Sequence, residues 1–108
     1  MPKLLTTYEQ ILSVAQPAPL SVRVERKRLY DFSDMWALAN AVVGEDKPAT
    51  SIDYWLKRAG VVPKGSTPRR AKYWHSHLEY FFLYCACRRF CSHNNQEANR
   101  VYDELSTQ

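Results

Sequence analysis

The sequence predicts a small α+β domain that is mostly helical, with four to five helices and a β-hairpin in its N-terminal half packed on them. Apolar residues recur in several segments at the offsets that line one face of an α-helix. One segment nearer the N-terminus instead alternates apolar and polar residues, as a half-buried strand does. With 108 residues, 45% of them hydrophobic, the chain is long enough for one core and too short for a catalytic domain plus a separate recognition domain.

Four segments combine the helical spacing with residues that commonly begin or end helices. They are residues 8–15, 35–43, 52–59 and 98–105. Thr6 and Glu9 have the spacing of a capping box at the start of the first segment. Ser33 and Asp34, Ser51, and Asn94 and Asn95 are the candidate caps of the other three. Gly44 and Gly60 follow the second and third segments, where glycine favours a helix end because it adopts a left-handed backbone without strain.

A further helix is predicted between the third and fourth segments. From Leu78 to Cys87, only Glu79 interrupts a run of apolar and aromatic residues. A helix that is apolar on all sides belongs in the interior of a domain. We therefore expect this helix to be the buried centre of the fold.

The predicted hairpin covers residues 20–30. Apolar and polar side chains alternate in residues 20–24, and residues 29–30 follow a charged stretch that would form the turn. This pattern is typical of two strands with one buried face. A second short extended piece is expected at residues 61–62.

The order of these elements resembles that of the KilA-N domain, a module frequent in proteins of bacteriophages and large DNA viruses. The likeness rests on residues 23–35, which resemble the family's hairpin and its entry into the first helix, and on two aromatic motifs further along. These motifs are Tyr54-Trp55-Leu56 and Tyr73-Trp74-His75 followed by Leu78. The resemblance implies DNA binding and transcription regulation, or the antirepressor and other host-virus interference functions associated with the family.

The likeness covers about residues 20–90. It divides the chain into an N-terminal helix and linker at residues 1–19 and a KilA-N-like domain at residues 20–108. Because it is an analogy at the level of the fold, it points to a class of partner and leaves the target open.

The distribution of charge is the most informative functional feature. Residues 54–78 contain six basic residues and no Asp or Glu, within a chain of net charge +4. The six are Lys57, Arg58, Lys64, Arg69, Arg70 and Lys72. Such clusters bind phosphates because each neutralised phosphate releases condensed counterions. The alternative is a solvated surface with no partner, since charge runs are commonly just exposed.

Two hydroxyls and a second basic cluster complete the predicted nucleic-acid site. Ser66 and Thr67 lie in a loop that is expected to lead into a helix start, whose free N–H groups would also take a phosphate. The second cluster is Arg23, Arg26, Lys27 and Arg28 on the hairpin. These residues would form a wing on the DNA backbone, or would simply keep an exposed strand from aggregating.

Double-stranded DNA is therefore the predicted partner, and a host or phage regulatory protein is the alternative. Trp36 falls off the apolar stripe of its helix, and Tyr54 is also a candidate for exposure. Exposed aromatic residues would favour a protein-binding face or a homodimer contact, whereas completion of the core is their commoner fate.

Catalytic and metal sites are not indicated by the residue pattern. No nucleophile beside a base, no carboxylate pair in apolar surroundings and no glycine-rich phosphate loop stands out, so we expect a non-enzymatic protein without a cofactor. Cys85, Cys87 and Cys91 with the nearby histidines suggest zinc, but Cys85 and Cys87 point to nearly opposite sides of one helix. We expect the cysteines to be core residues, and His75 and His77 to be capping or packing residues.

The expected location is the cytoplasm of a bacterial host cell. Residues 1–10 hold no apolar run of signal-peptide length, and the longest apolar run, residues 80–87, is too short to cross a membrane. Three cysteines close together do not form the paired framework of a secreted mini-protein.

Overall fold

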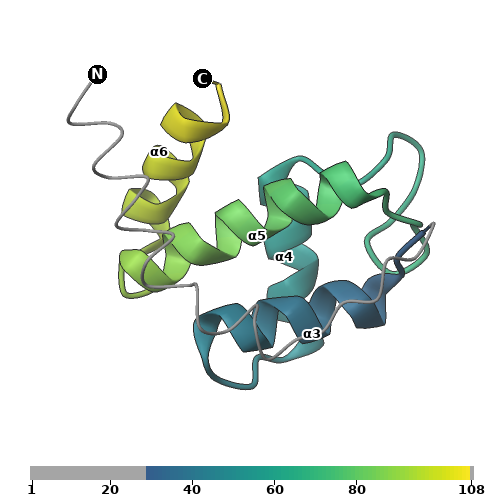
Figure 1. Cartoon of the computed structure of the whole chain (residues 1–108), viewed down its shortest axis with the longest axis horizontal. Coiled ribbons are helices and arrows are strands. Elements are labelled where there is room, and N and C mark those ends of the chain that lie inside the picture. The colour runs from purple at the N-terminus through teal and green to yellow at the C-terminus, as the bar shows by residue number, and fades with distance from the viewer. Residues whose placement is uncertain (1–28, 108) are drawn as a thin grey trace.

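A computed structural model describes residues 29–107, which form four α-helices and contain no β-strand (Figure 1). The helices are α3, Phe32–Val43; α4, Ala49–Ala59; α5, His75–Phe90; and α6, Asn95–Ser106. The α+β prediction is therefore wrong, because this part of the protein is all-helical. Four of the five predicted helices are confirmed, and the predicted helix at residues 8–15 lies outside the described residues.

At the described end of the predicted hairpin, the structure contains an isolated backbone bridge and no strand. Its first strand and turn, residues 20–28, lie outside the described part of the chain. Tyr30, which was expected in the return strand, pairs with Tyr73: the Tyr30 N–H donates to the Tyr73 carbonyl at 2.8 Å, and the reverse bond measures 2.7 Å. Asp31 caps α3 directly after this bridge. The pairing cannot extend into a strand because the chain enters a helix within one residue.

The start of α3 is set by a reciprocal capping box just before the predicted caps. The Asp31 carboxylate accepts the backbone N–H of Asp34, and the Asp34 carboxylate accepts that of Asp31, both at 3.0 Å. Gly44 and Gly60 end α3 and α4 with φ angles of 77° and 75°, as predicted. Both lie in the left-handed region, where a side chain costs about 1–2 kcal/mol.

The cap predicted for α6 is confirmed, whereas α4 begins before its predicted cap. Asn94 caps α6 as expected, because its side chain accepts the Glu97 N–H at 3.0 Å. The helix α4 begins earlier than the candidate cap Ser51, after Pro48, whose fixed φ suits a helix entry. Proline therefore starts α4 through its backbone geometry, without a side-chain cap.

The helix α5 is the centre of the fold, as its apolar sequence predicts. It packs against α3, α4 and α6, and Figure 1 shows it running between α3 and α6 with α4 crossing behind. Fully buried side chains follow its length, namely Phe81, Tyr84, Cys85, Ala86 and Cys87. None of the helices within residues 29–107 is long and apolar enough to pass through a lipid bilayer.

A buried tyrosine fastens α6 to the end of α4. The Tyr102 hydroxyl donates to the Ala59 carbonyl at 2.6 Å, and the tyrosine is only 4% exposed. Burial raises the pKa of Tyr102 to about 12, so the hydroxyl stays protonated and remains a donor at neutral pH. This bond satisfies a carbonyl in the last turn of α4, where no following helical N–H is available.

We expect Tyr102→Phe to lower the free energy of unfolding by about 1–2 kcal/mol, because it leaves the Ala59 carbonyl buried without its donor. Tyr80→Phe is the matched control, since Tyr80 is 48% exposed and its hydroxyl has no hydrogen-bond partner among residues 29–107. That control should change the free energy by less than about 0.5 kcal/mol. Urea unfolding followed by circular dichroism measures both, and equal effects would contradict the role given to the Tyr102 hydroxyl.

Candidate nucleic-acid interface

The basic residues of the predicted site lie on the end of α4 and on the connection from α4 to α5, residues 60–74. This connection contains turns and no strand, so the extended piece predicted at residues 61–62 is absent. A single turn at residues 67–71 takes the place of the predicted helix start, and α5 begins only at His75. Ser66 and Thr67 are therefore exposed loop residues rather than part of a helix N-terminus.

The connection is held to the core by a buried tyrosine. The Tyr73 side chain is fully buried, and its hydroxyl donates to the Pro68 carbonyl at 2.7 Å. Val61 and Ala71 are also buried, at 4% exposure each. Because the chain touches the core near both ends and in the middle, the loop presents its polar side chains from a defined backbone.

Two of the six predicted cations are engaged by carboxylates from elsewhere in the chain. The Arg58 guanidinium binds the Asp103 carboxylate through two hydrogen bonds, at 3.1 and 2.7 Å, which joins α4 to α6. Arg69 binds Asp53 of α4, with Nη2 to Oδ2 at 3.0 Å, and lies over the Phe32 ring at 5.3 Å from its centroid. These two arginines therefore hold helices and loop together.

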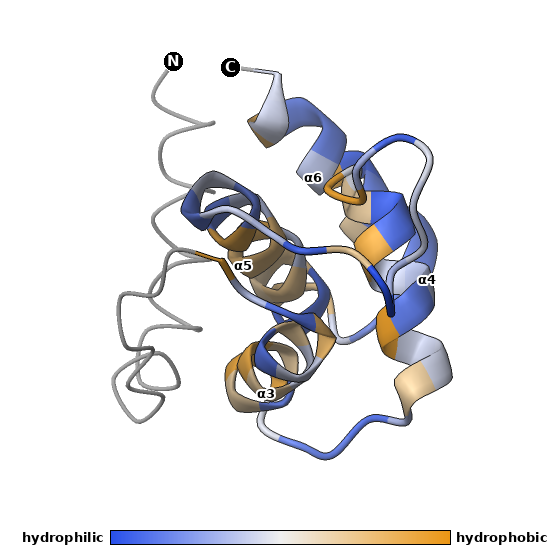
Figure 2. Cartoon of the chain, turned by 90° about the vertical axis from the view of Figure 1, so that its right-hand side faces the viewer, coloured by the Kyte–Doolittle hydropathy of each residue, from blue (hydrophilic) through white to orange (hydrophobic). Residues whose placement is uncertain are grey.

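The other four cations, Lys57, Lys64, Arg70 and Lys72, form what we call the basic surface. All four are exposed, and no carboxylate of residues 29–107 lies within ion-pair distance of them. Figure 2 shows hydrophilic stretches on both α4 and the connection that follows it. The positive charge available to a ligand is therefore four rather than the six predicted by the acid-free stretch.

The pairing acids are functional residues that sequence reasoning did not identify. The residue pattern assigned neither Asp53 nor Asp103 a role in this site. Their partners lie 16 and 45 residues away in sequence, at Arg69 and Arg58. No local spacing rule connects residues so far apart, so only the packing of α4 and α6 reveals these ion pairs.

The second predicted cluster lies outside the described residues. Arg23, Arg26, Lys27 and Arg28 were predicted on a hairpin wing, and the structure gives them no position relative to the basic surface. They stay predictions of the sequence.

Three aromatic side chains, on α4 and in the first half of α5 with its cap, are exposed. Tyr54, for which exposure and completion of the core were both considered, is 44% exposed, and Trp74 and Tyr80 are 55% and 48% exposed. The latter two were not predicted to be exposed. Trp36 is instead half-buried, and its indole Nε1–H donates to the Lys47 carbonyl at 2.7 Å. The start of α5 is thus less buried than its apolar sequence suggests.

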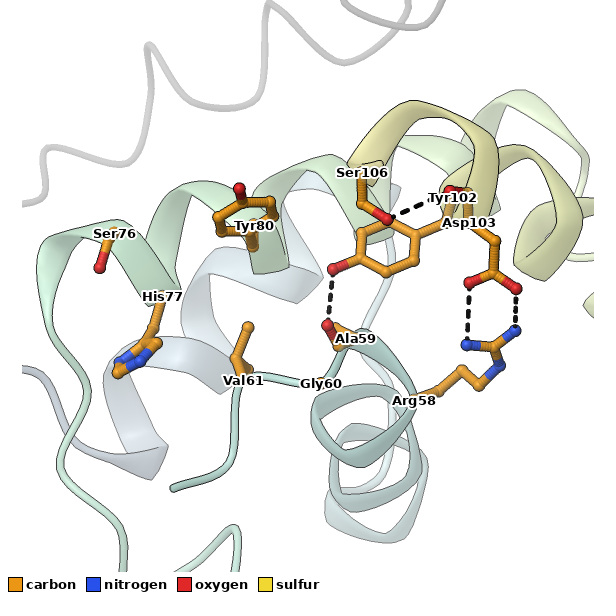
Figure 3. A pocket seen from close by; sticks show the side chains of 10 residues that line it. All are labelled: Arg58, Ala59, Gly60, Val61, Ser76, His77, Tyr80, Tyr102, Asp103 and Ser106. Carbon is orange, nitrogen blue, oxygen red and sulfur yellow. Dashed lines mark hydrogen bonds and ion pairs between the residues drawn. The ribbon is translucent and has the colours of Figure 1, made fainter. Parts of the chain in front are cut away.

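An open groove of about 550 Å³ lies between the end of α4, the start of α5 and α6 (Figure 3). The Arg58–Asp103 pair stands at one end, and His77 stands at the other. Tyr80 and Tyr102 line the side between them, above the backbone at Gly60. The groove is therefore bordered by one of the arginines that the sequence assigned to nucleic-acid binding.

His77 acts as a capping residue, as the sequence predicts. Its Nδ1 accepts the backbone N–H of Trp74 at 3.0 Å. In the neutral form of the ring, this bond places the proton on Nε2. His77 therefore brings a donor to the groove that it lines.

The cysteines lie in or beside the core. Cys85 and Cys87 are fully buried, Cys91 is partly exposed, and all three are free thiols. Burial raises the pKa of Cys87 to about 12 and that of Cys85 well above its ordinary value. Within residues 29–107, no group of three or more Cys, His, Asp or Glu side chains is arranged to hold a metal ion.

Neither the scan of protein-family models nor the searches of curated proteins and of solved structures finds a match to this chain. The resemblance to the KilA-N family consequently stays a prediction from the motifs.

We expect Arg69→Ala to lower the free energy of unfolding by about 1 kcal/mol, since an exposed ion pair and a cation–π contact are each worth up to about that amount. Arg69→Lys should recover only part of this, because an ammonium group cannot reproduce the fork of the guanidinium. The matched control is Arg70→Ala, which removes the same charge one residue away, where no described acid pairs with it. Equal losses in urea unfolding would show that Arg69 does not hold the loop.

Thiol reactivity should separate the cysteines by burial. We expect a disulfide reagent to modify Cys91 slowly in the folded protein and to leave Cys85 and Cys87 untouched, because the reactive thiolate is disfavoured where the pKa is raised. All three thiols should react after unfolding in urea, as counted by absorbance of the released reagent. Rapid reaction of two or more thiols in the folded protein would contradict their place in the core.

Proposed function

We propose that the protein is a small non-enzymatic DNA-binding module that contacts the phosphates of double-stranded DNA through the basic surface. The observation that carries the proposal is the exposure of Lys57, Lys64, Arg70 and Lys72 without an acid partner among residues 29–107. Binding a phosphate releases more free energy for an unpaired cation than for one whose ion pair with a carboxylate must first be broken. Each phosphate neutralised releases counterions, which favours binding at low salt.

The rigidity of the loop supports this proposal. Tyr73 and Arg69 hold residues 60–74 against the core and α4, so the cations are presented with little backbone freedom left to lose. Pre-organised groups bind more tightly because less conformational entropy is lost on association. Ser66 and Thr67 are exposed on the same loop, where their hydroxyls can donate to phosphate oxygens.

The outer face of α4 extends the basic surface along a helix. Thr50, Tyr54 and Lys57 are exposed at positions that share one helical face. Hydroxyl and ammonium groups can bind phosphates or the edges of bases, and the major groove of B-DNA admits an α-helix. We propose α4 as the helix that lies closest to the duplex.

The predicted residues Arg23, Arg26, Lys27 and Arg28 would add phosphate contacts if they approach the same face. The proposal also places the protein in the cytoplasm of a bacterial host, a reducing compartment that suits three free thiols.

A second candidate function is inhibition of a host or phage protein, as in an antirepressor or an anti-defence protein. It is supported by the exposed rings of Tyr54, Trp74 and Tyr80, because aromatic side chains often form the centre of protein interfaces. The basic surface favours the nucleic-acid partner, since charged residues are depleted at the core of protein interfaces.

A charge-matched pair of variants tests DNA binding. We expect Lys64→Gln with Arg70→Gln to weaken binding to random duplex DNA and to reduce the slope of log affinity against log salt by up to about two units, one for each lost phosphate contact. Fluorescence anisotropy over a salt titration measures both quantities.

The control, Lys47→Gln with Arg100→Gln, removes the same two charges from cations that are already paired with Glu45, Glu97 and Glu104. It should leave the slope unchanged. If both variants reduce affinity equally, only net charge matters and the basic surface is not the contact. Absence of any duplex binding at about 50 mM salt would overturn the proposal and favour the protein-binding candidate.

A further inference from the structure

Two tyrosines, Tyr80 and Tyr102, line one side of the groove that Arg58 of α4 borders. Of the two tyrosines that line it, Tyr102 is 4% exposed and its hydroxyl is bonded to Ala59, whereas Tyr80 is 48% exposed. Figure 3 shows the Tyr80 ring on α5, on the same side of the groove as Tyr102. An exposed ring beside a groove offers a flat apolar surface on which another flat ring can stack.

The polar groups around the groove suit a ligand that combines a neutral, hydrogen-bonding ring with an anionic chain attached to it. His77 brings a donor at Nε2, and Ser76 brings a hydroxyl. The Asp103 carboxylate, the only acid among the described residues that line the groove, is neutralised by two hydrogen bonds from Arg58. An anionic ligand therefore meets no unpaired negative charge among these lining residues of the described part of the chain.

Cations of the basic surface adjoin the groove along the chain. Lys57 precedes the groove residue Arg58, and Lys72 lies four residues before the groove residue Ser76. A strand of nucleic acid held by these cations would carry its bases past Tyr80. The volume of about 550 Å³ is within the range that accommodates a small organic ligand.

We infer that this groove binds an unpaired nucleobase, which stacks on Tyr80 while the flanking phosphates lie on the basic surface. The inference rests on the proposed function and narrows it, because a base within a duplex is already stacked and cannot enter a groove between helices. Duplex DNA is held through its phosphates alone, and the protein therefore binds single-stranded DNA, or a frayed or flipped base, more tightly than a fully paired duplex of the same length. Stacking tolerates any base because every base has a π-face.

The test compares a fluorescent oligothymidine of about ten nucleotides with a duplex of the same length, using anisotropy at fixed salt. We expect Tyr80→Leu to weaken binding of the single strand by roughly tenfold or more and to change duplex binding by less than about twofold. Tyr80→Phe keeps the ring and should retain the affinity for the single strand. Tyr80→Trp enlarges the ring and should increase it.

The outcomes separate the two proposals. If the protein binds the duplex but not oligothymidine, or if Tyr80→Leu and Tyr80→Trp both leave single-strand affinity unchanged, the groove inference is wrong and the proposed function stands. If the protein binds neither nucleic acid, the proposed function fails and the inference fails with it. The variants with tryptophan and phenylalanine keep the test valid even if Tyr80→Leu unfolds, because both retain an aromatic side chain at the same exposed position.

Discussion

The guanidinium of Arg88 is buried between α4, α5 and α6, and the placement of these three helices depends on how that charge is satisfied. Arg88 is only 7% exposed. It donates to Asn95 Oδ1 at 2.6 Å and to the Tyr84 hydroxyl at 3.3 Å, and it lies over the Trp55 ring at 4.6 Å from the centroid. No carboxylate of residues 29–107 pairs with it, and its Nε atom has no hydrogen-bond partner. Burying a cation costs free energy unless several groups surround it. The three helices must therefore be placed so that all of these groups reach the guanidinium.

The same network determines how the candidate site is presented. The Tyr84 hydroxyl also donates to Asn99 of α6, and the Asn99 amide donates to the Tyr54 hydroxyl of α4. Arg58 and Asp103 join the two helices again near the groove. The outer face of α4 and the groove between α4 and α6 are therefore positioned by the contacts that satisfy the buried charge. A substitution in this network is expected to disturb the binding surface as well as the stability of the fold.

The number of basic residues in the acid-free stretch is larger than the number that stay without an ion pair in the described structure. The acid-free stretch of residues 54–78 correctly identified where cations are concentrated, but Asp53 and Asp103 reach it from outside the stretch. Both paired cations are arginines, whose planar, forked donors fit a carboxylate, while the third arginine of the stretch, Arg70, belongs to the basic surface. The paired and unpaired cations consequently differ in what they contact. Arg58 and Arg69 join helices and loop through ion pairs, whereas the four cations of the basic surface stay exposed to solvent.

By itself, the sequence determined the elements whose signals are local. Helical spacing located α3, α4 and α6, Gly44, Gly60 and Asn94 marked their ends, and the uninterrupted apolar run identified α5 as the central helix. These features depend on residues within a few positions of one another.

Tertiary structure alone decided that Tyr30 pairs with Tyr73 instead of forming a strand of a hairpin, and which cations remain unpaired. It also decided that Tyr80 stays exposed within an apolar helix. Each of these outcomes depends on side chains that folding brings together from distant positions in the sequence. The alternation of apolar and polar residues, or the charge of one segment, does not show which distant residue will lie next to it.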